Sequence, residues 1–187
     1  MASAIWIKIY ILIPNILYLN RPNWAVFLCL NMKYRQLTKE QFLELHKEFA
    51  EFLATQQIDV KEWEIIKKDK PSMAEEELNI FSDVVWENVL TKAEYLEHIS
   101  DNHINLFKCT SKEIIRIYIQ LNDKTKSFLN DSDFQWFLNN PMDDRIEYFK
   151  ASKKYKKERN IEVFKLIEMG SSISKGKLFK TMAQLIG

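Results

Sequence analysis

The sequence predicts an α+β fold, with N-terminal helices, then a small antiparallel β-sheet of two to three strands, then C-terminal helices. Two observations predict this class. Four helix-capping patterns follow one another in the first half of the chain, and strictly alternating apolar and polar residues come after them at 115–121. Capping patterns mark helix starts, whereas alternation with a period of two marks a strand with one buried face.

Each capping pattern places Ser, Thr or Asp three positions before Glu or Gln. Such a pair satisfies backbone N–H groups that the first turn of a helix leaves without a partner. The patterns are Thr38 with Gln41, Asp59 with Glu62, Ser72 with Glu75, and Thr91 with Glu94. Together with apolar residues at helical spacing, they predict helices at about 38–55, 60–69, 73–89 and 92–99.

The predicted sheet is centred on the alternating segment. Its apolar positions are Ile115, Ile117, Ile119 and Leu121, and its polar positions are Arg116, Tyr118 and Gln120. His103–Cys109 is the expected partner strand, joined to it by a turn at 110–113. Arg145–Lys150 is a candidate for a third strand.

Three further helices are expected in the second half of the chain. A short one at Phe134–Asn139 ends before Pro141, and we expect its Trp136 in the core, with an interface anchor as the alternative. The next ends at Gly170, a residue type favoured directly after a helix. The last runs from about 175 to 186.

The composition excludes several classes of protein. The chain has 187 residues, 27 Lys and Arg against 26 Asp and Glu, and 47% hydrophobic residues, which is typical of a globular protein. The net charge of +1 excludes nucleic-acid binding through bulk charge alone. Three glycines exclude a Rossmann fingerprint, and two cysteines exclude a disulfide framework.

Residues 1–31 differ from the rest of the chain. They contain no Asp or Glu, and Lys8 and Arg21 are their only charged residues. Their longest uncharged run, Ile9–Asn20, is shorter than the roughly 20 apolar residues of a transmembrane helix. We therefore expect 1–31 to be a misassigned N-terminal extension before a single α+β domain at 32–187. A membrane or export segment and a folded part of the domain are the alternatives.

We expect no catalytic residue, no cofactor and no metal site. His46, His98 and His103 lie in no cluster of ligands, and a zinc site needs three or four. Nothing in the sequence proposes a histidine partner that would make Cys109 a nucleophile. The adjacent carboxylates at 143–144 are expected on the surface, not as an acid–base pair.

The distribution of charge is the most informative feature for function. Residues 150–187 carry a net charge of +7, whereas residues 32–149 carry −8. The candidate residues for binding an anion or a partner are Lys150, Lys153, Lys154, Tyr155, Lys156, Lys157 and Arg159. Either a helix starts at about Lys153 and projects past the core, or it starts near Arg159. Both arrangements leave the lysines exposed.

Several short segments resemble a known family. They are MKYRQLTKEQF at 32–42, FLATQ at 52–56, FSD at 81–83, WE at 86–87, EYLEH at 94–98, YFK at 148–150 and SKKY at 152–155. The family consists of small proteins of Bacteroidota described only as a domain of unknown function, and the resemblance covers essentially 32–187. It implies a bacterial, cytoplasmic protein that begins at Met32. It implies no activity, cofactor or catalytic residue.

The sequence therefore favours a non-enzymatic cytoplasmic interaction or regulatory protein, with a protein partner contacted by a sheet face or by the basic 150–159 segment. An RNA- or nucleotide-associated module is the first alternative, with the lysines on phosphate and Tyr155 stacking on a base. An enzyme whose site forms only in three dimensions is the second. A domain associated with a membrane through residues 1–31 is the third.

Overall fold

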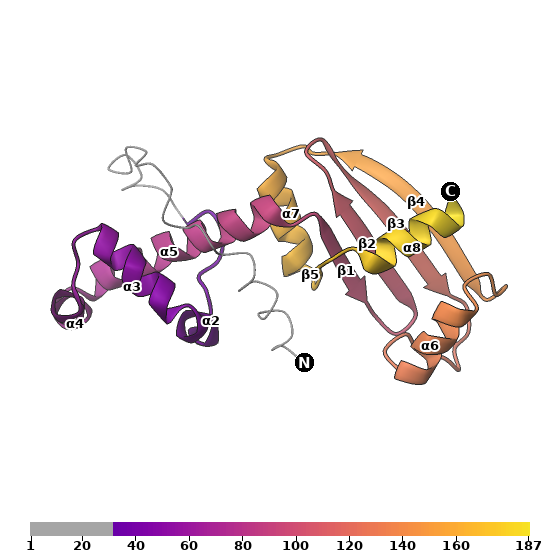
Figure 1. The fold of residues 1–187 in the computed structure, drawn as a ribbon, viewed down its shortest axis with the longest axis horizontal. Helices are drawn as coiled ribbons and strands as arrows, with labels where there is room; N and C mark the ends of the chain where they lie inside the picture. Colours follow the sequence, from indigo (N-terminus) through magenta and orange to yellow (C-terminus); the bar gives the residue numbers. More distant parts are fainter. Residues whose placement is uncertain (1–31) are drawn as a thin grey trace. The chain divides into compact units, whose positions relative to one another are not determined.

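The computed structural model describes residues 32–187, so the expected extension at 1–31 lies outside the described residues. The chain divides after Lys92 into two compact units. The described residues form seven helices and a five-stranded antiparallel sheet (Figure 1). The predicted α+β class is confirmed, but the sheet has more strands than the two to three expected. That residues 32–187 form a single domain stays a prediction.

The described part of the first unit is helical. Its helices are α2 (Lys39–Glu44), α3 (His46–Thr55), α4 (Val60–Asp69) and α5 (Pro71–Lys92). The helix predicted at 38–55 is divided at Leu45, whose φ of −101° and ψ of 22° depart from helical values. Hydrogen bonds continue across the division, because the Leu45 N–H donates to Gln41 O and the Phe49 N–H donates to Leu45 O.

Two of the predicted capping patterns do start helices. Thr38 and Gln41 make both bonds of the capping box, so α2 begins as expected. The Asp59 side chain accepts a hydrogen bond from the Glu62 N–H at 2.8 Å, which starts α4. These caps satisfy backbone donors that would otherwise lack a partner in the first turn.

The other two capping patterns do not start helices. Helix α5 begins at Pro71, whose missing N–H costs nothing in the first helical position, so Ser72 lies inside the helix. Thr91 lies in the last turn of α5 and starts nothing. A capping pattern is a local signal: Pro71 starts α5 one residue before Ser72, and α5 continues through Thr91, next to the buried Val89 and Leu90.

The second unit is built on the sheet. Its strands are β1 (Tyr95–Ile99), β2 (His103–Cys109), β3 (Glu113–Leu121), β4 (Ile146–Lys154) and β5 (Ser172–Ser174). They lie in the order β4-β3-β2-β1-β5, and every neighbouring pair is antiparallel. The predicted β2–β3 hairpin is confirmed, and its turn is closed by the Thr110 N–H donating to Glu113 O at 3.0 Å.

The helix predicted at 92–99 is wrong, because strand β1 occupies that segment. Tyr95 pairs with Lys108 of β2 on one side and with Ser174 of β5 on the other. Pairing on both sides satisfies the backbone of a segment that is too short to form a stable helix by itself. The three-residue strand β5 has no counterpart among the sequence expectations.

The predicted order of a sheet followed by helices is also not exact. Helix α6 (Asp131–Asn139) lies between β3 and β4, and β5 lies between α7 (Arg159–Glu168) and α8 (Lys177–Ile186). Strand β4 continues to Lys154, four residues beyond the predicted end at Lys150. The helices do begin and end near the expected residues, including α7, which ends before Gly170.

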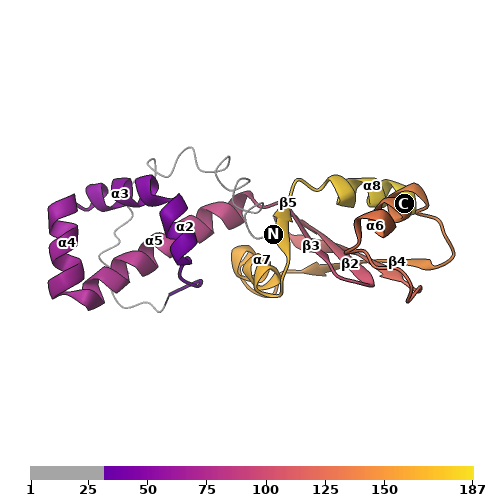
Figure 2. The same cartoon turned by 90° about the horizontal axis from the view of Figure 1, so that it is seen from below.

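The two faces of the sheet are covered differently. Helices α6 and α8 lie over one face, and α7 lies against the other (Figure 2). The core under α6 and α8 contains Ile104, Ile117, Ile119, Phe137 and Met182, each almost fully buried. Helix α7 is short: its first residue bonds to the β2–β3 turn, and Gly170, just after its end, lies beside His98 of β1, so the helix covers only part of its face.

Gly176 precedes α8 in a conformation that only glycine fits. Its φ is +71°, and a Cβ atom added there would lie 2.3 Å from Cγ of Tyr95. The backbone therefore passes directly over the Tyr95 ring as it enters α8, and any side chain would push the helix away from the sheet.

Replacing Gly176 with Ala is expected to lower the free energy of unfolding by about 2–4 kcal/mol, from backbone strain and overpacking together. Urea denaturation followed by circular dichroism measures this change. Gly187→Ala is the matched control, because Gly187 also has a positive φ but has nothing within 4 Å of an added Cβ. Equal effects of the two substitutions would contradict the close approach at Tyr95.

Candidate functional site

The basic segment lies partly on a strand and partly in a turn. Strand β4 includes the first three of its lysines and ends at Lys154, and α7 begins at Arg159. Of the two predicted arrangements, a helix starting near Arg159 is confirmed and a helix starting at Lys153 is wrong. Because β4 is the outermost strand of the sheet, its lysines lie along a sheet edge.

Two of the β4 lysines have partners within the protein. The Lys150 Nζ donates to the Gly187 carbonyl oxygen at 2.6 Å, and the Lys153 Nζ forms an ion pair with Glu162 at 2.9 Å. Lys154 is exposed. Lysines on an edge strand also prevent other chains from pairing with its outer backbone groups.

Tyr155 and Arg159 anchor the turn before α7. The Tyr155 hydroxyl donates to Thr110 O at 2.9 Å. The Arg159 guanidinium donates to Ala93 O, Cys109 O and Thr110 O. Both side chains thus hold the β2–β3 turn, and their hydrogen-bonding groups are engaged inside the second unit.

Glu162 organises the rest of the basic segment. Its carboxylate is 8% exposed and accepts from the Lys153 Nζ, from the Lys157 N–H at 2.8 Å, and from the Lys156 N–H. The side-chain bond from Lys153, followed by these backbone bonds, lowers the pKa of Glu162 to about 2. Lys156 and Lys157 therefore use their backbone groups for structure and keep their side chains exposed.

Glu162→Gln is expected to lower the free energy of unfolding at pH 7 by about 2 kcal/mol, since the variant removes hydrogen bonds to a charged group. The pKa of Glu162 is lowered by folding, so its stabilisation is present above about pH 4.5 and is lost as pH falls towards about 2. Urea denaturation between pH 2 and pH 7 should show the two proteins converging at low pH. Glu94→Gln, at an exposed position, is the control; a difference that is constant across this range contradicts the assignment.

The second candidate surface is the part of the α7-side face that α7 leaves uncovered, here called the open face. A continuous row of rings crosses four strands there, with centroids 5.9 Å apart from Phe149 to Tyr118, 5.6 Å from Tyr118 to His103, and 6.0 Å from His103 to His98. Phe149 is 55% exposed although it lies on a strand. We call these four residues the aromatic row.

A single arginine is held beside the aromatic row. The Arg116 Nε donates to Asn105 Oδ1 at 2.9 Å, Nη2 donates to the same oxygen, and the guanidinium carbon lies 4.9 Å from the centre of the Tyr118 ring. Asn105 is buried, so it fixes the guanidinium from below. Arg116, Tyr118, Phe149 and Ala151 line a shallow groove of about 350 Å³.

His103 contributes a neutral ring to the row. Burial, with smaller contributions from His98 and Arg116, lowers its pKa below the usual value of 6.5. Its Nδ1 lies 2.9 Å from the Ser100 hydroxyl and 3.0 Å from Asn102 Oδ1, which fixes the ring. Within residues 32–187, no group of three or more His, Cys, Asp or Glu side chains is placed to hold a metal ion.

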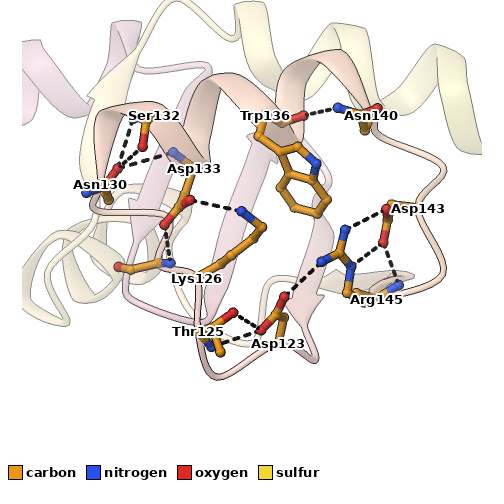
Figure 3. A network of polar contacts seen from close by, with 11 residues as sticks. Asp123, Thr125, Lys126, Asn130, Ser132, Asp133, Trp136, Asn140, Asp143 and Arg145 are labelled. Atoms are coloured by element: carbon orange, nitrogen blue, oxygen red, sulfur yellow. Dashed lines mark hydrogen bonds and ion pairs between the residues drawn. The ribbon is translucent and has the colours of Figure 1, made fainter.

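A polar network beside α6 is occupied by internal contacts (Figure 3). Arg145 donates to Asp143 at 2.7 and 2.9 Å and to Asp123 at 2.9 Å, and it lies over the ring of Trp136 together with Lys126. Arg145 lowers the pKa of Asp143 to about 2, whereas a general acid needs a raised pKa. The network therefore ties the β3–α6 connection to the start of β4, and the partly buried Trp136 packs against the core.

Cys109 is a buried strand residue. It is 3% exposed, and burial raises the pKa of its thiol to about 11. Because the thiolate is the reactive form, this side chain is inert at neutral pH.

We expect iodoacetamide at pH 8 to modify Cys109 slowly in the folded protein and quickly in urea. Mass spectrometry of tryptic peptides separates its modification from that of Cys29, which lies outside the described residues. Equal rates with and without urea would contradict the burial of the thiol.

The sequence pattern pointed to part of the open face. The alternation in β3 places Arg116, Tyr118 and Gln120 on one side of a strand, and a sheet face was one of the two expected contact surfaces. The contribution of Phe149 depends on the β3–β4 register, which pairs it with Tyr118. The contribution of His98 depends on β1 being a strand, and the local pattern favoured a helix there.

No helix among the described residues is both long enough and apolar enough to cross a membrane. Comparison with curated proteins found no match, and comparison with solved structures found none either. A family model, described as a family of unknown function (DUF6495), matches residues 32–187. The match spans most of the chain and the whole described region, so the protein belongs to this family.

Proposed function

We propose that this member of a family of unknown function is a non-enzymatic binding protein of the bacterial cytoplasm, which contacts its partner through the open face. The aromatic row carries the proposal. Aromatic side chains on a strand are normally covered, yet Phe149 is largely exposed beside Tyr118, on the part of the sheet that no described helix covers. Aromatic residues together with arginine are enriched where proteins bind macromolecules.

The chemistry of the open face supports binding in preference to catalysis. Its side chains are mainly rings, the amides of Asn105 and Gln120, and one guanidinium, which suit contacts by stacking and hydrogen bonding. The Tyr118 hydroxyl is already engaged, since it donates to Gln120 Oε1 at 2.5 Å. Association with a membrane through residues 1–31 stays a prediction.

The proposal is tested by photocrosslinking in cells of the source organism, with the full chain at its native level. p-Benzoyl-L-phenylalanine replaces Phe149 in one variant and Leu129 in the other. Leu129 is a matched control because it is 61% exposed and lies outside the aromatic row.

We expect a discrete crosslinked species from position 149 and none from position 129. Protease and nuclease treatment then identify the crosslinked partner as protein or nucleic acid. The absence of any species specific to position 149 would overturn the proposal.

A further inference from the structure

We infer that the ligand of the open face is a single-stranded nucleic acid whose bases stack on the aromatic row and whose phosphates contact Arg116 and the exposed lysines Lys156 and Lys157 of the turn after β4. This inference rests on the proposed function and names the partner of the same surface. It uses the basic segment as a flank of the site.

The aromatic row has the form of a stacking platform. Every base has a flat face, so single-stranded nucleic acids bind exposed aromatic side chains in succession, with little dependence on sequence. Phe149 and Tyr118 are paired across the β3–β4 ladder. His103 and His98 extend the row, with ring centroids 5.6 Å apart from Tyr118 to His103 and 6.0 Å apart from His103 to His98. An antiparallel sheet that presents aromatic residues on one open face is a recurrent solution for binding unpaired bases.

The cation beside the row can accept an anion. Arg116 donates to a neutral amide, Asn105, and is exposed, so its positive charge is not neutralised by that contact. The Asn105 contact already orients the guanidinium in the free protein. Binding therefore does not have to order this side chain, which favours affinity. Arginine held in this way suits both phosphate contacts and stacking against a base.

The cations at the open face and in the turn beside it suit a polyanion. Strand alternation places Arg116 and Glu147 on the open face, and Lys153 lies on the same side of the sheet but pairs with Glu162 of α7. Lys156 and Lys157 follow β4 with exposed side chains, whereas Lys154 pairs with Glu113 and therefore points to the opposite face of the sheet. Residues 93–187 carry 16 Lys and Arg against 13 Asp and Glu.

A protein partner fits these features less well. The centre of a protein interface is apolar and depleted of charge, whereas only the Phe149 end of this row is apolar, and His98, His103, Asn105 and Arg116 lie along the rest of it. The lysine-rich edge strand also disfavours the addition of a strand from another protein.

The test is fluorescence anisotropy of the full chain with labelled 12-nucleotide oligo-uridine, oligo-deoxythymidine and a mixed-sequence DNA duplex, at 50 and 200 mM salt. We expect the single strands to bind more tightly than the duplex and to weaken as salt rises. The two single-stranded probes separate an RNA ligand from a DNA ligand, because a contact with the 2′-hydroxyl favours RNA.

Variants at Phe149 separate stacking from apolar docking. Phe149→Leu keeps an apolar side chain but removes the ring, and should weaken binding about ten-fold. Phe149→Tyr restores the ring and should recover most of that affinity. Leu129→Ala, outside the aromatic row, is the control, and circular dichroism checks that each variant is folded.

A double substitution of Lys156 and Lys157 by Ala tests the flank. It should make the affinity less dependent on salt, and the log–log slope should fall by about 0.7 for each lysine that pairs with a phosphate.

The outcomes distinguish this inference from the proposed function. Absence of oligonucleotide binding at 50 mM salt, with a protein crosslinked at position 149, overturns the inference and leaves the proposed function standing. Binding that Phe149→Leu does not weaken also overturns it, because the nucleic acid is then held through the lysines alone. Absence of both oligonucleotide binding and crosslinking overturns both.

Discussion

The antiparallel pairing of β3 with β2 and β4 is the constraint on which the second unit depends. Because strand side chains alternate between faces, one register commits Ile117 and Ile119 to the core and Arg116 and Tyr118 to the opposite face. A shift by one residue would bury the arginine and expose the isoleucines. The hydrophobic core under α6 and α8 therefore also determines the composition of the open face.

The extent of the open face depends on where α7 lies and on the side chains that hold it there. Arg159 holds the first turn of α7 to the β2–β3 turn through the carbonyls of Cys109 and Thr110, and to the segment before β1 through Ala93 O. The Glu162 carboxylate accepts hydrogen bonds from the residues that lead into the helix. These contacts hold the start of α7 against the sheet. The helix has 10 residues, and Phe149 of β4 remains largely exposed. The residues of the basic segment that hold α7 in place therefore help decide which part of this face stays open.

In the second unit, several acidic side chains are held in internal contacts, whereas the cation on the open face is not paired with an acid in the described part of the chain. Asp143, Asp123 and Glu162 each accept hydrogen bonds from cations or backbone N–H groups, which lowers the pKa of each. Arg116, in contrast, is fixed by a neutral amide. A net charge of +1 for the whole chain conceals this arrangement, because residues 32–92 have 9 Lys and Arg against 13 Asp and Glu, whereas residues 93–187 have 16 against 13. Local pairing, and not the total charge, decides where an anion can bind.

The sequence by itself determined the helices that have strong local signals and the β2–β3 hairpin. The Thr38 box, the Asp59 cap and the alternation in β3 act through neighbouring residues, so their information lies within a few positions. The tertiary structure alone decided that 95–99 is a strand, because its partners β2 and β5 lie 4 and 73 residues further along the chain. It also decided that Phe149 joins Tyr118 and that Arg159 faces inwards. Those outcomes depend on the register between strands and on distant carbonyl groups, which no local pattern of residues contains.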